Sequence, residues 1–282
     1  MSRTSCRLTI QSKLKSLTKV ETKIALYVLE NFDEILNYNV TELAEKAETS
    51  EASVIRFCKS TGYKGYQDFK INAAKDVLPL YKHINPNLEQ QDSIGTICHK
   101  IFDSEIAVLN ETLALLVPEM LEAAVKALVG AGQIIFFGSG GSIIVGLDAQ
   151  HKLLKIGVNS TVHQDMDMQA MSASLLKKGD VAIAISHSGS NRNLIHCMQL
   201  ARKQGATIIA LTTQGKSPLM KLADVLLHTS TKETVFKSES VSARIAQLAV
   251  IDALVASVAF AQYEKSFSAI QSTRKATSQG KY

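Results

Sequence analysis

Serine and glycine residues gather at two points of the chain, each directly after a short apolar run. Residues 180–193 read DVAIAISHSGSNRN, and residues 133–142 read QIIFFGSGGS. Small hydroxyl side chains and free backbone N–H groups at the start of a helix are typical of phosphate sites, because the helix dipole favours an anion there. We therefore expect Ser142, Ser186 and Ser188 to bind one phosphate group together.

Glycine and serine also form ordinary turns after strands, so either loop alone would be weak support for a phosphate site. Two such loops at the ends of neighbouring strands are stronger support. Neither loop is a P-loop, because the Gly-Lys-Ser/Thr ending is missing, and GSGGS lacks the spacing of a dinucleotide-binding loop. The pattern therefore predicts a phosphate site outside the common nucleotide-binding motifs.

The loops need a scaffold, and from Gly132 onward short apolar runs alternate with helical segments. The runs cover residues 133–138, 158–162, 181–186, 207–212 and 225–229. This alternation predicts a parallel sheet with helices on both faces, in which ligands bind outside the carboxyl ends of the strands. A long helix is expected over residues 94–116, and a second one over residues 241–261.

Composition is that of an ordinary soluble globular protein, with 46% hydrophobic and 20% charged residues. Residues 241–261 contain Arg244, Gln247 and Asp252, which favours a core helix over a membrane span, so no membrane partner is expected. No secretory signal is apparent at the N-terminus. The cysteines have neither disulfide-framework nor metal-ligand spacing, so we expect reduced thiols, a cytoplasmic location and no metal site. They are Cys6, Cys58, Cys98 and Cys197.

The first eighty residues show helical periodicity instead of strands. Thr18 and Glu21 form a capping box at the start of one helix, and short helices are predicted over residues 40–47 and 51–60, the last one capped by Ser50. Two short helices joined by a tight turn fit the major groove of DNA. Six basic residues and one acid within residues 1–24 also indicate a polyanionic partner.

In such a geometry, the second short helix presents its polar residues to DNA. We expect Ser50, Ser53 and Arg56 to approach base edges or phosphates, and basic side chains to follow the DNA backbone. Those basic side chains are Lys59, Lys64 and Lys70. The alternative from the residues alone is a plain three-helix bundle with a basic, solvated face.

Residues 40–70, VTELAEKAETSEASVIRFCKSTGYKGYQDFK, resemble the helix-turn-helix domain of the RpiR family of bacterial transcription regulators. FFGSGGS, DAQHKLLKIG, KKGDVAIAISHSGS and ARKQGATIIALT resemble the SIS (sugar isomerase) domain of the same family. The resemblance implies an all-α helix-turn-helix domain followed by an α/β SIS domain with a five-stranded, flavodoxin-like parallel sheet. We expect a DNA-binding domain over residues 1–78, a linker over 79–93, the SIS domain over 94–262 and a tail over 263–282.

The resemblance also assigns ligand residues. Ser142, Ser186 and Ser188 match the phosphate contacts of the family, with Ser139 and Asn191 as neighbours. His163 and Asp165 match positions that can reach sugar hydroxyls or an N-acyl group, and Glu239 matches the region near the sugar ring. The alternatives are that His163 and Asp165 cap the helix that follows and that Glu239 is a solvated acid.

Together these features predict a transcriptional regulator, expected to be a repressor of sugar or amino-sugar catabolism genes. The expected partners are a double-stranded DNA operator, a sugar-phosphate effector and further copies of the chain in a dimer or tetramer. The best candidate effector is a phosphorylated N-acetyl amino sugar, and no other cofactor is expected. The alternative is an aldose-ketose isomerase, which is disfavoured because Ser190 and Asn191 stand where related isomerases often have Glu-Thr.

Overall fold

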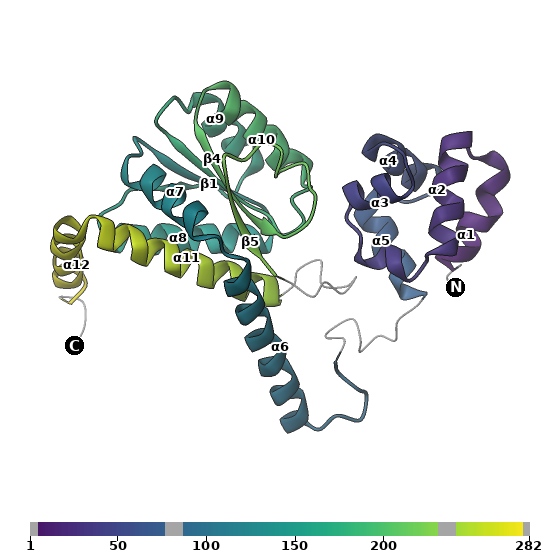
Figure 1. Cartoon of the computed structure of the whole chain (residues 1–282), viewed down its shortest axis with the longest axis horizontal. Coiled ribbons are helices and arrows are strands. Elements are labelled where there is room, and N and C mark those ends of the chain that lie inside the picture. The colour runs from purple at the N-terminus through teal and green to yellow at the C-terminus, as the bar shows by residue number, and fades with distance from the viewer. Residues whose placement is uncertain (1–4, 77–86, 231–240, 279–282) are drawn as a thin grey trace. The chain divides into compact units, whose positions relative to one another are not determined.

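The computed structural model of the chain describes residues 5–76, 87–230 and 241–278, and for Val241 and Ser242 the backbone alone (Figure 1). The described residues form two compact units, one ending at Ser104 and the other beginning at Glu105. The boundary between them falls inside a single helix, α6 (Ile94–Leu115).

The N-terminal unit is helical, and polar caps set the start of its helices. The Thr18 capping box begins α2, a second box formed by Asn39 and Glu42 begins α3, and Ser50 caps α4. Large apolar side chains such as Phe57 form its core. The helices are α1 (Cys6–Lys13), α2 (Lys19–Glu30), α3 (Val40–Lys46), α4 (Glu51–Ser60) and α5 (Tyr66–Lys75), with 3-10 turns at Leu14–Ser16 and Glu34–Asn37.

The second unit contains a parallel sheet with the strand order β2-β1-β3-β4-β5. This arrangement confirms the predicted fold class. The strands are β1 (Ile134–Phe137), β2 (Thr161–Val162), β3 (Val181–Ile185), β4 (Thr207–Thr213) and β5 (Val225–Thr229). The central strands β1 and β3 are buried along their whole length, because helices cover both faces.

The sheet's two faces carry different helices (Figure 1). Phe136 and Ile183 face α7 (Pro118–Val129), α8 (Gly141–Lys155) and α11 (Val241–Ala261). Phe137 and Ala184 face α9 (Met166–Leu175) and α10 (Arg192–Lys203). Because β1, β3 and β4 run in the same direction, the starts of α8 and α10 lie at one edge of the sheet.

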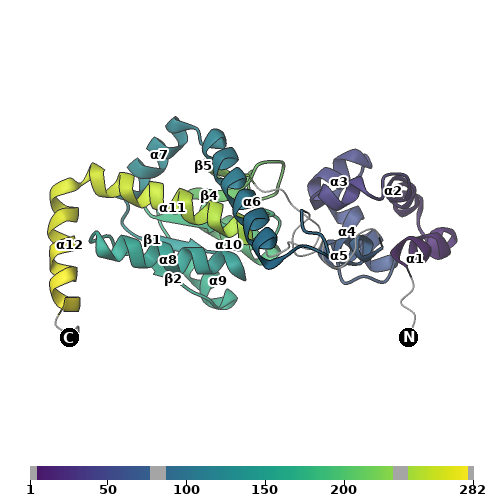
Figure 2. The same cartoon turned by 90° about the horizontal axis from the view of Figure 1, so that it is seen from below.

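Helix α11 runs beside α8 (Figure 2). By length and composition its segment Ala243–Ala261 could cross a membrane, and core helices of soluble proteins pass the same test. Val250, Leu254 and Val258 of this helix are buried in the core of the second unit. The environment of α11 therefore agrees with the predicted core helix.

Residues 263–278 form a helix, α12 (Tyr263–Ser278), within the segment expected to be a tail. Its Ile270 packs against the core of the second unit. A Cβ atom at Gly157 would lie 2.8 Å from Cβ of Ala269, and Gly157 has a φ of +77°, so glycine is required there for two reasons. Helix α12 is thus packed onto the domain that precedes it.

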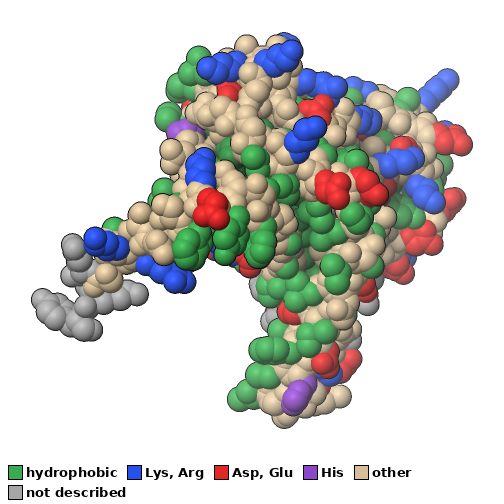
Figure 3. All heavy atoms as spheres, turned by 60° about the vertical axis from the view of Figure 1, so that its left-hand side comes forward, with side chains coloured by type: hydrophobic (Ala, Val, Ile, Leu, Met, Phe, Trp, Pro, Cys, Tyr) green, Lys and Arg blue, Asp and Glu red, His purple; other side chains and the backbone are tan. Residues whose placement is uncertain are grey.

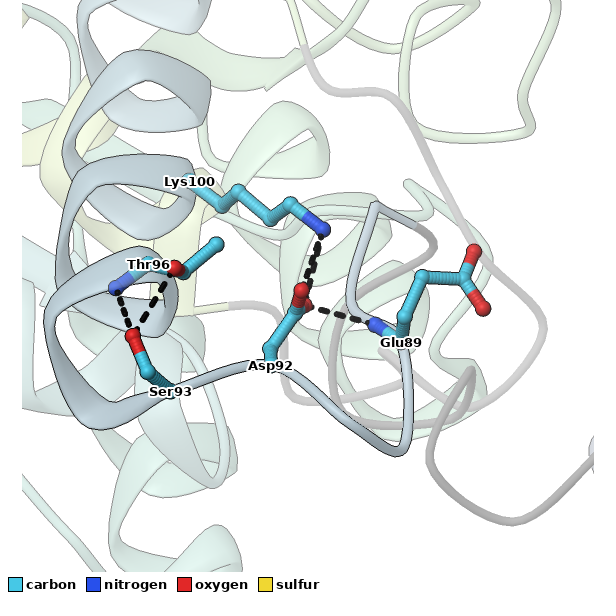
Figure 4. A network of polar contacts seen from close by, with 5 residues as sticks. All are labelled: Glu89, Asp92, Ser93, Thr96 and Lys100. Carbon is cyan, nitrogen blue, oxygen red and sulfur yellow. Dashed lines mark hydrogen bonds and ion pairs between the residues drawn. The ribbon is translucent and has the colours of Figure 1, made fainter.

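The start of α6 is tied to the chain before it by a network of polar contacts (Figure 4). The carboxylate of Asp92 accepts hydrogen bonds from Nζ of Lys100 at 2.7 Å and from the backbone N–H of Glu89 at 2.7 Å. Ser93 Oγ accepts from the backbone N–H of Thr96 at 3.2 Å, as an N-cap does. Residues 89–93 are therefore ordered against α6.

Candidate phosphate site and DNA-binding helix

The loop between β1 and α8 exposes its backbone at the carboxyl end of the sheet. Gly140 has a φ of +57°, and a Cβ atom there would meet nothing within 4 Å. Ser139 is half-buried, and its carbonyl oxygen accepts from the N–H of Ser142 at 3.2 Å. The open side of this turn leaves room for an anion at the N-terminus of α8.

The loop between β3 and α10 is built around two buried residues, Ser186 and Gly189. Ser186 is 7% exposed, and its Oγ accepts from the N–H of Gly189 at 3.1 Å. Gly189 has a φ of +59°, and a Cβ atom there would lie 2.2 Å from Oγ of Ser217. Only glycine satisfies both conditions. The turn leaves Ser188 exposed, with its Oγ accepting from the N–H of Ser190 at 3.4 Å.

Asn191 joins the two loops. Its Oδ1 accepts from the N–H of Leu194 at 3.0 Å and caps α10, while its Nδ2 donates to Oγ of Ser139 at 3.0 Å. Adjacent strands β1 and β3 pair Phe137 with Ala184 just before the loops begin. The structure therefore brings both serine-rich loops and two helix N-termini to the same edge of the sheet.

One cation lies beside these loops and was not among the ligand residues expected from sequence. A Cβ atom at Gly141 would lie 3.4 Å from Nε of Arg244, so the guanidinium of this α11 residue lies against the start of α8. Guanidinium groups bind phosphate oxygens in a bidentate manner. The sequence signal was a basic residue in the first turn of a largely apolar helix, but the position of Arg244 depends on how α11 packs on α8.

The loop after β2 holds the residues expected to face the sugar. His163 is half-buried, and its carbonyl oxygen accepts from Nε2 of Gln169 at 2.8 Å. Asp165 Oδ1 accepts from the N–H of Met168 at 2.9 Å, so Asp165 caps α9, as the alternative to a sugar contact predicts. Glu239, also expected at the sugar, lies outside the described residues.

In the N-terminal unit, the polar residues of α4 are linked to one another. Oγ of Ser53 lies 2.9 Å from Oγ of Ser50, and Nη2 of Arg56 donates to Oγ of Ser53 at 2.9 Å. Ser53 is only 6% exposed, whereas Ser50 and Arg56 are exposed. Ser53 therefore orients Arg56, and its own contact with DNA stays a prediction.

The basic residues expected along the DNA backbone differ in exposure. Lys59 and Lys64 are exposed, as a phosphate contact requires. Lys70 is 6% exposed, so the expectation that it lies along DNA is wrong. Its helix, α5, turns Lys70 inward beside Phe69 and Ala73, which are part of the core.

Glu21 and Cys6 are among the groups of this unit whose pKa values are shifted. The pKa of Glu21 is lowered, chiefly by the hydrogen bond from Oγ of Ser60 at 2.6 Å and by the N–H of Thr18 at 3.0 Å. Burial raises the pKa of the Cys6 thiol to about 11.

Within the three described ranges, no group of three His, Cys, Asp or Glu side chains could hold a metal ion.

Two family models match this chain. Residues 5–78 match the helix-turn-helix domain of the rpiR family, and residues 127–257 match the SIS domain. An uncharacterized HTH-type transcriptional regulator of Caldanaerobacter subterraneus is 38% identical, and the match covers 96% of each chain. The chain belongs to the RpiR family. It is a helix-turn-helix transcriptional regulator rather than an isomerase.

Two further similar proteins extend this comparison. The HTH-type transcriptional regulator HexR of Pseudomonas aeruginosa is 36% identical over 88% of this chain and 87% of HexR. Among solved structures, NanR of Vibrio vulnificus complexed with ManNAc-6P has a TM-score of 0.80 and 29% identity, covering 96% of this chain and 98% of NanR. The RpiR fold of this chain thus matches that of a regulator with a bound sugar phosphate.

Proposed function

We propose that this RpiR-family protein is a repressor of sugar or amino-sugar catabolism genes, and that a sugar phosphate in the second unit controls its binding to an operator. The observation that carries the proposal is the hydrogen bond between Asn191 and Ser139, which unites two serine-rich loops at two helix N-termini. The bound ManNAc-6P in NanR supports a ligand of this class.

In this proposal, the phosphate accepts hydrogen bonds from the hydroxyl groups of Ser142, Ser186 and Ser188. Arg244 adds a positive charge at the start of α8. His163 and Glu239 contact the sugar. The effector is a phosphorylated N-acetyl amino sugar, since NanR has the same overall fold and holds one.

Helix α4 enters the major groove of a double-stranded operator. Ser50 and Arg56 contact bases or phosphates, while Lys59 and Lys64 bind the DNA backbone and Ser53 holds Arg56 in place. Because Lys and Arg displace counterions from DNA, raising the salt concentration weakens this binding steeply. The protein acts in the cytoplasm.

The protein works as a homo-oligomer, most simply a dimer. Exposed apolar side chains lie along α6 and at the junction of α11 and α12 (Figure 3). At that junction the ring of Tyr263 contacts the rings of Phe260 and Phe267. Large exposed aromatic side chains are typical of protein interfaces. A dimer places two α4 helices at half-sites about 34 Å apart or a multiple of that.

The direct test is a gel-shift titration of duplexes from the genomic neighbourhood of the gene, with a panel of sugar phosphates. Ser186→Ala is expected to lose the response to the effector and to keep its operator affinity, because Ser186 and α4 belong to different compact units. Ser174→Ala, on the exposed side of α9, is the matched control. Failure of the wild-type protein to bind any such duplex, with or without sugar phosphates, contradicts the proposal.

A thermal-shift screen identifies the effector. A ligand present at 100 times its dissociation constant stabilises the protein by about 2.7 kcal/mol, which raises the unfolding temperature measurably. The panel includes N-acetylated hexosamine phosphates and plain hexose phosphates. Equal shifts with both groups contradict the assignment of an N-acetyl amino sugar.

A further inference from the structure

Gln169 is a fully buried amide between the two ends of the candidate ligand site. It is 0% exposed. Its Oε1 accepts from the N–H of Gly138 at 3.1 Å, and its Nε2 donates to the carbonyl oxygen of Gly138 at 2.9 Å. The same Nε2 also donates to the carbonyl oxygen of His163 at 2.8 Å. Both amide hydrogens are therefore used, each on a different loop.

These bonds replace strand pairing where the sheet ends. Strand β2 has two residues and pairs only with β1, through Ile135 with Thr161 and Phe136 with Val162. His163 comes directly after the last pair. Beyond that pair, the side chain of Gln169 connects His163 to Gly138, the residue that begins the β1–α8 loop.

Helix α9 does not depend on Gln169 for its own place. Its Ala173 is buried against α10 and the sheet, together with Leu176 just after the helix, and Asp165 caps its first turn. Removing the amide hydrogen bonds should therefore leave α9 in position and release the link between the two loops. This separation makes a specific role of Gln169 testable.

We propose that Gln169 is a positioning residue that fixes the separation between the phosphate-binding loops and His163, and thereby selects sugar phosphates by length. This inference rests on the function proposed above. A ligand whose phosphate and ring substituents match the fixed separation contacts both ends at once. A shorter sugar phosphate, or phosphate alone, reaches only the serine loops.

The test measures three affinities by isothermal titration calorimetry, for N-acetylmannosamine 6-phosphate, ribose 5-phosphate and inorganic phosphate. Gln169→Met keeps the side-chain length but cannot bridge the loops. We expect it to bind inorganic phosphate as the wild type does and to lose about tenfold in affinity for the hexose derivative, equivalent to about 1.4 kcal/mol. The control is Gln164→Glu, at an exposed position in the loop between β2 and α9. We expect it to keep the wild-type ratio of the affinities for the hexose derivative and inorganic phosphate.

Gln169→Glu adds a readout that a merely structural role would not give. A buried carboxylate facing two carbonyl oxygens is unfavourable, so its pKa is raised, and on protonation it regains one hydrogen-bond donor. Relative to the wild type at each pH, its preference for the hexose derivative should recover partly between about pH 7.5 and about pH 5.5. Gln169→Met should show no such recovery.

The outcomes separate the two proposals. If the wild-type protein binds none of the three probes, the proposed function and this inference both fail. If it binds them and Gln169→Met weakens all three equally, or leaves their ratio unchanged, only the role of Gln169 is overturned. Should Gln169→Met not fold, a pH-independent ratio in Gln169→Glu overturns it equally.

Discussion

Single hydroxyl groups decide how the proposed DNA-contacting side chains are held. Ser53 is nearly buried, yet its Oγ contacts both Ser50 and Arg56. The sequence placed Ser53 and Arg56 on α4 and Ser50 at its N-cap, but it could not separate a side chain that touches DNA from one that orients its neighbour. That distinction depends on rotamers and packing, which periodicity does not encode.

Ser53→Ala tests the orienting role. A partly exposed side-chain hydrogen bond contributes about 1 kcal/mol net, so its loss should lower operator affinity about fivefold. Arg56→Ala, which also removes the charge, should cost about 1–3 kcal/mol. Fluorescence anisotropy with a labelled operator measures both, and Lys203→Ala, at the exposed last residue of α10, serves as the control. A further loss when Ser53→Ala is added to Arg56→Ala would assign Ser53 a direct contact with DNA.

Glu21 predicts how the stability of the N-terminal unit depends on pH. Its pKa is lowered in the folded state by Ser60 and Thr18, so its contribution is present above the unfolded-state pKa and is lost as pH falls through the folded-state value. Glu21→Gln keeps an acceptor at this position but removes the charge that strengthens its hydrogen bonds, so it should destabilise the unit by about 1 kcal/mol at pH 7. Urea unfolding at pH 7 and at about pH 3 should show the difference shrinking at the lower pH. A pH-independent difference would contradict this.

At the scale of elements, much of the fold was predictable because its signals are local. The caps Thr18 and Ser50 located α2 and α4, and the apolar runs located all five strands. Strand β2 is shorter than its apolar run because it lies at the edge and pairs only with β1. Arg244 and Gln169 could not be placed, because they contact Gly141 and Gly138, which are distant in sequence.

The β3–α10 turn allows a test by paired substitutions. Gly189→Ala introduces a Cβ atom 2.2 Å from Oγ of Ser217 at a φ of +59°, so we expect a loss of about 2 kcal/mol or more. Ser217→Gly in the same chain removes the clash but not the backbone strain, so it should restore part of the stability. Scanning calorimetry of the full chain measures both variants. No rescue by Ser217→Gly would show that strain alone accounts for the loss.

At the scale of the whole molecule, α6 contains the boundary between the two units, since one unit ends at Ser104 and the other begins at Glu105. Near its end, Oγ1 of Thr112 accepts from the N–H of Ser230 at 3.0 Å, and Glu111 accepts from Oγ of Ser230 at 2.7 Å. Ser230 follows β5 and precedes the segment that contains Glu239. The ligand contact proposed for Glu239 would therefore act close to a residue that is hydrogen-bonded to α6, which offers a route for coupling between two sites.

Thr112→Val removes the acceptor for Ser230 while keeping the side-chain shape. We expect operator affinity and effector affinity, measured separately, to stay close to wild type. The effector should change operator affinity less than in the wild type, by about 1 kcal/mol of coupling free energy. Anisotropy titrations with and without effector measure this coupling. Full coupling in Thr112→Val would show that the hydrogen bond between Thr112 and Ser230 does not contribute to it.

The exposure of the four cysteines allows α6 to be labelled selectively. Cys98 on α6 is exposed, whereas Cys6, Cys58 and Cys197 are buried. Burial raises the pKa of each of these three thiols, which keeps them protonated and unreactive. A maleimide dye should therefore label the native protein at Cys98 alone, with no cysteine removed. The unmodified chain already carries a single attachment point for an optical reporter on the helix that joins its two units.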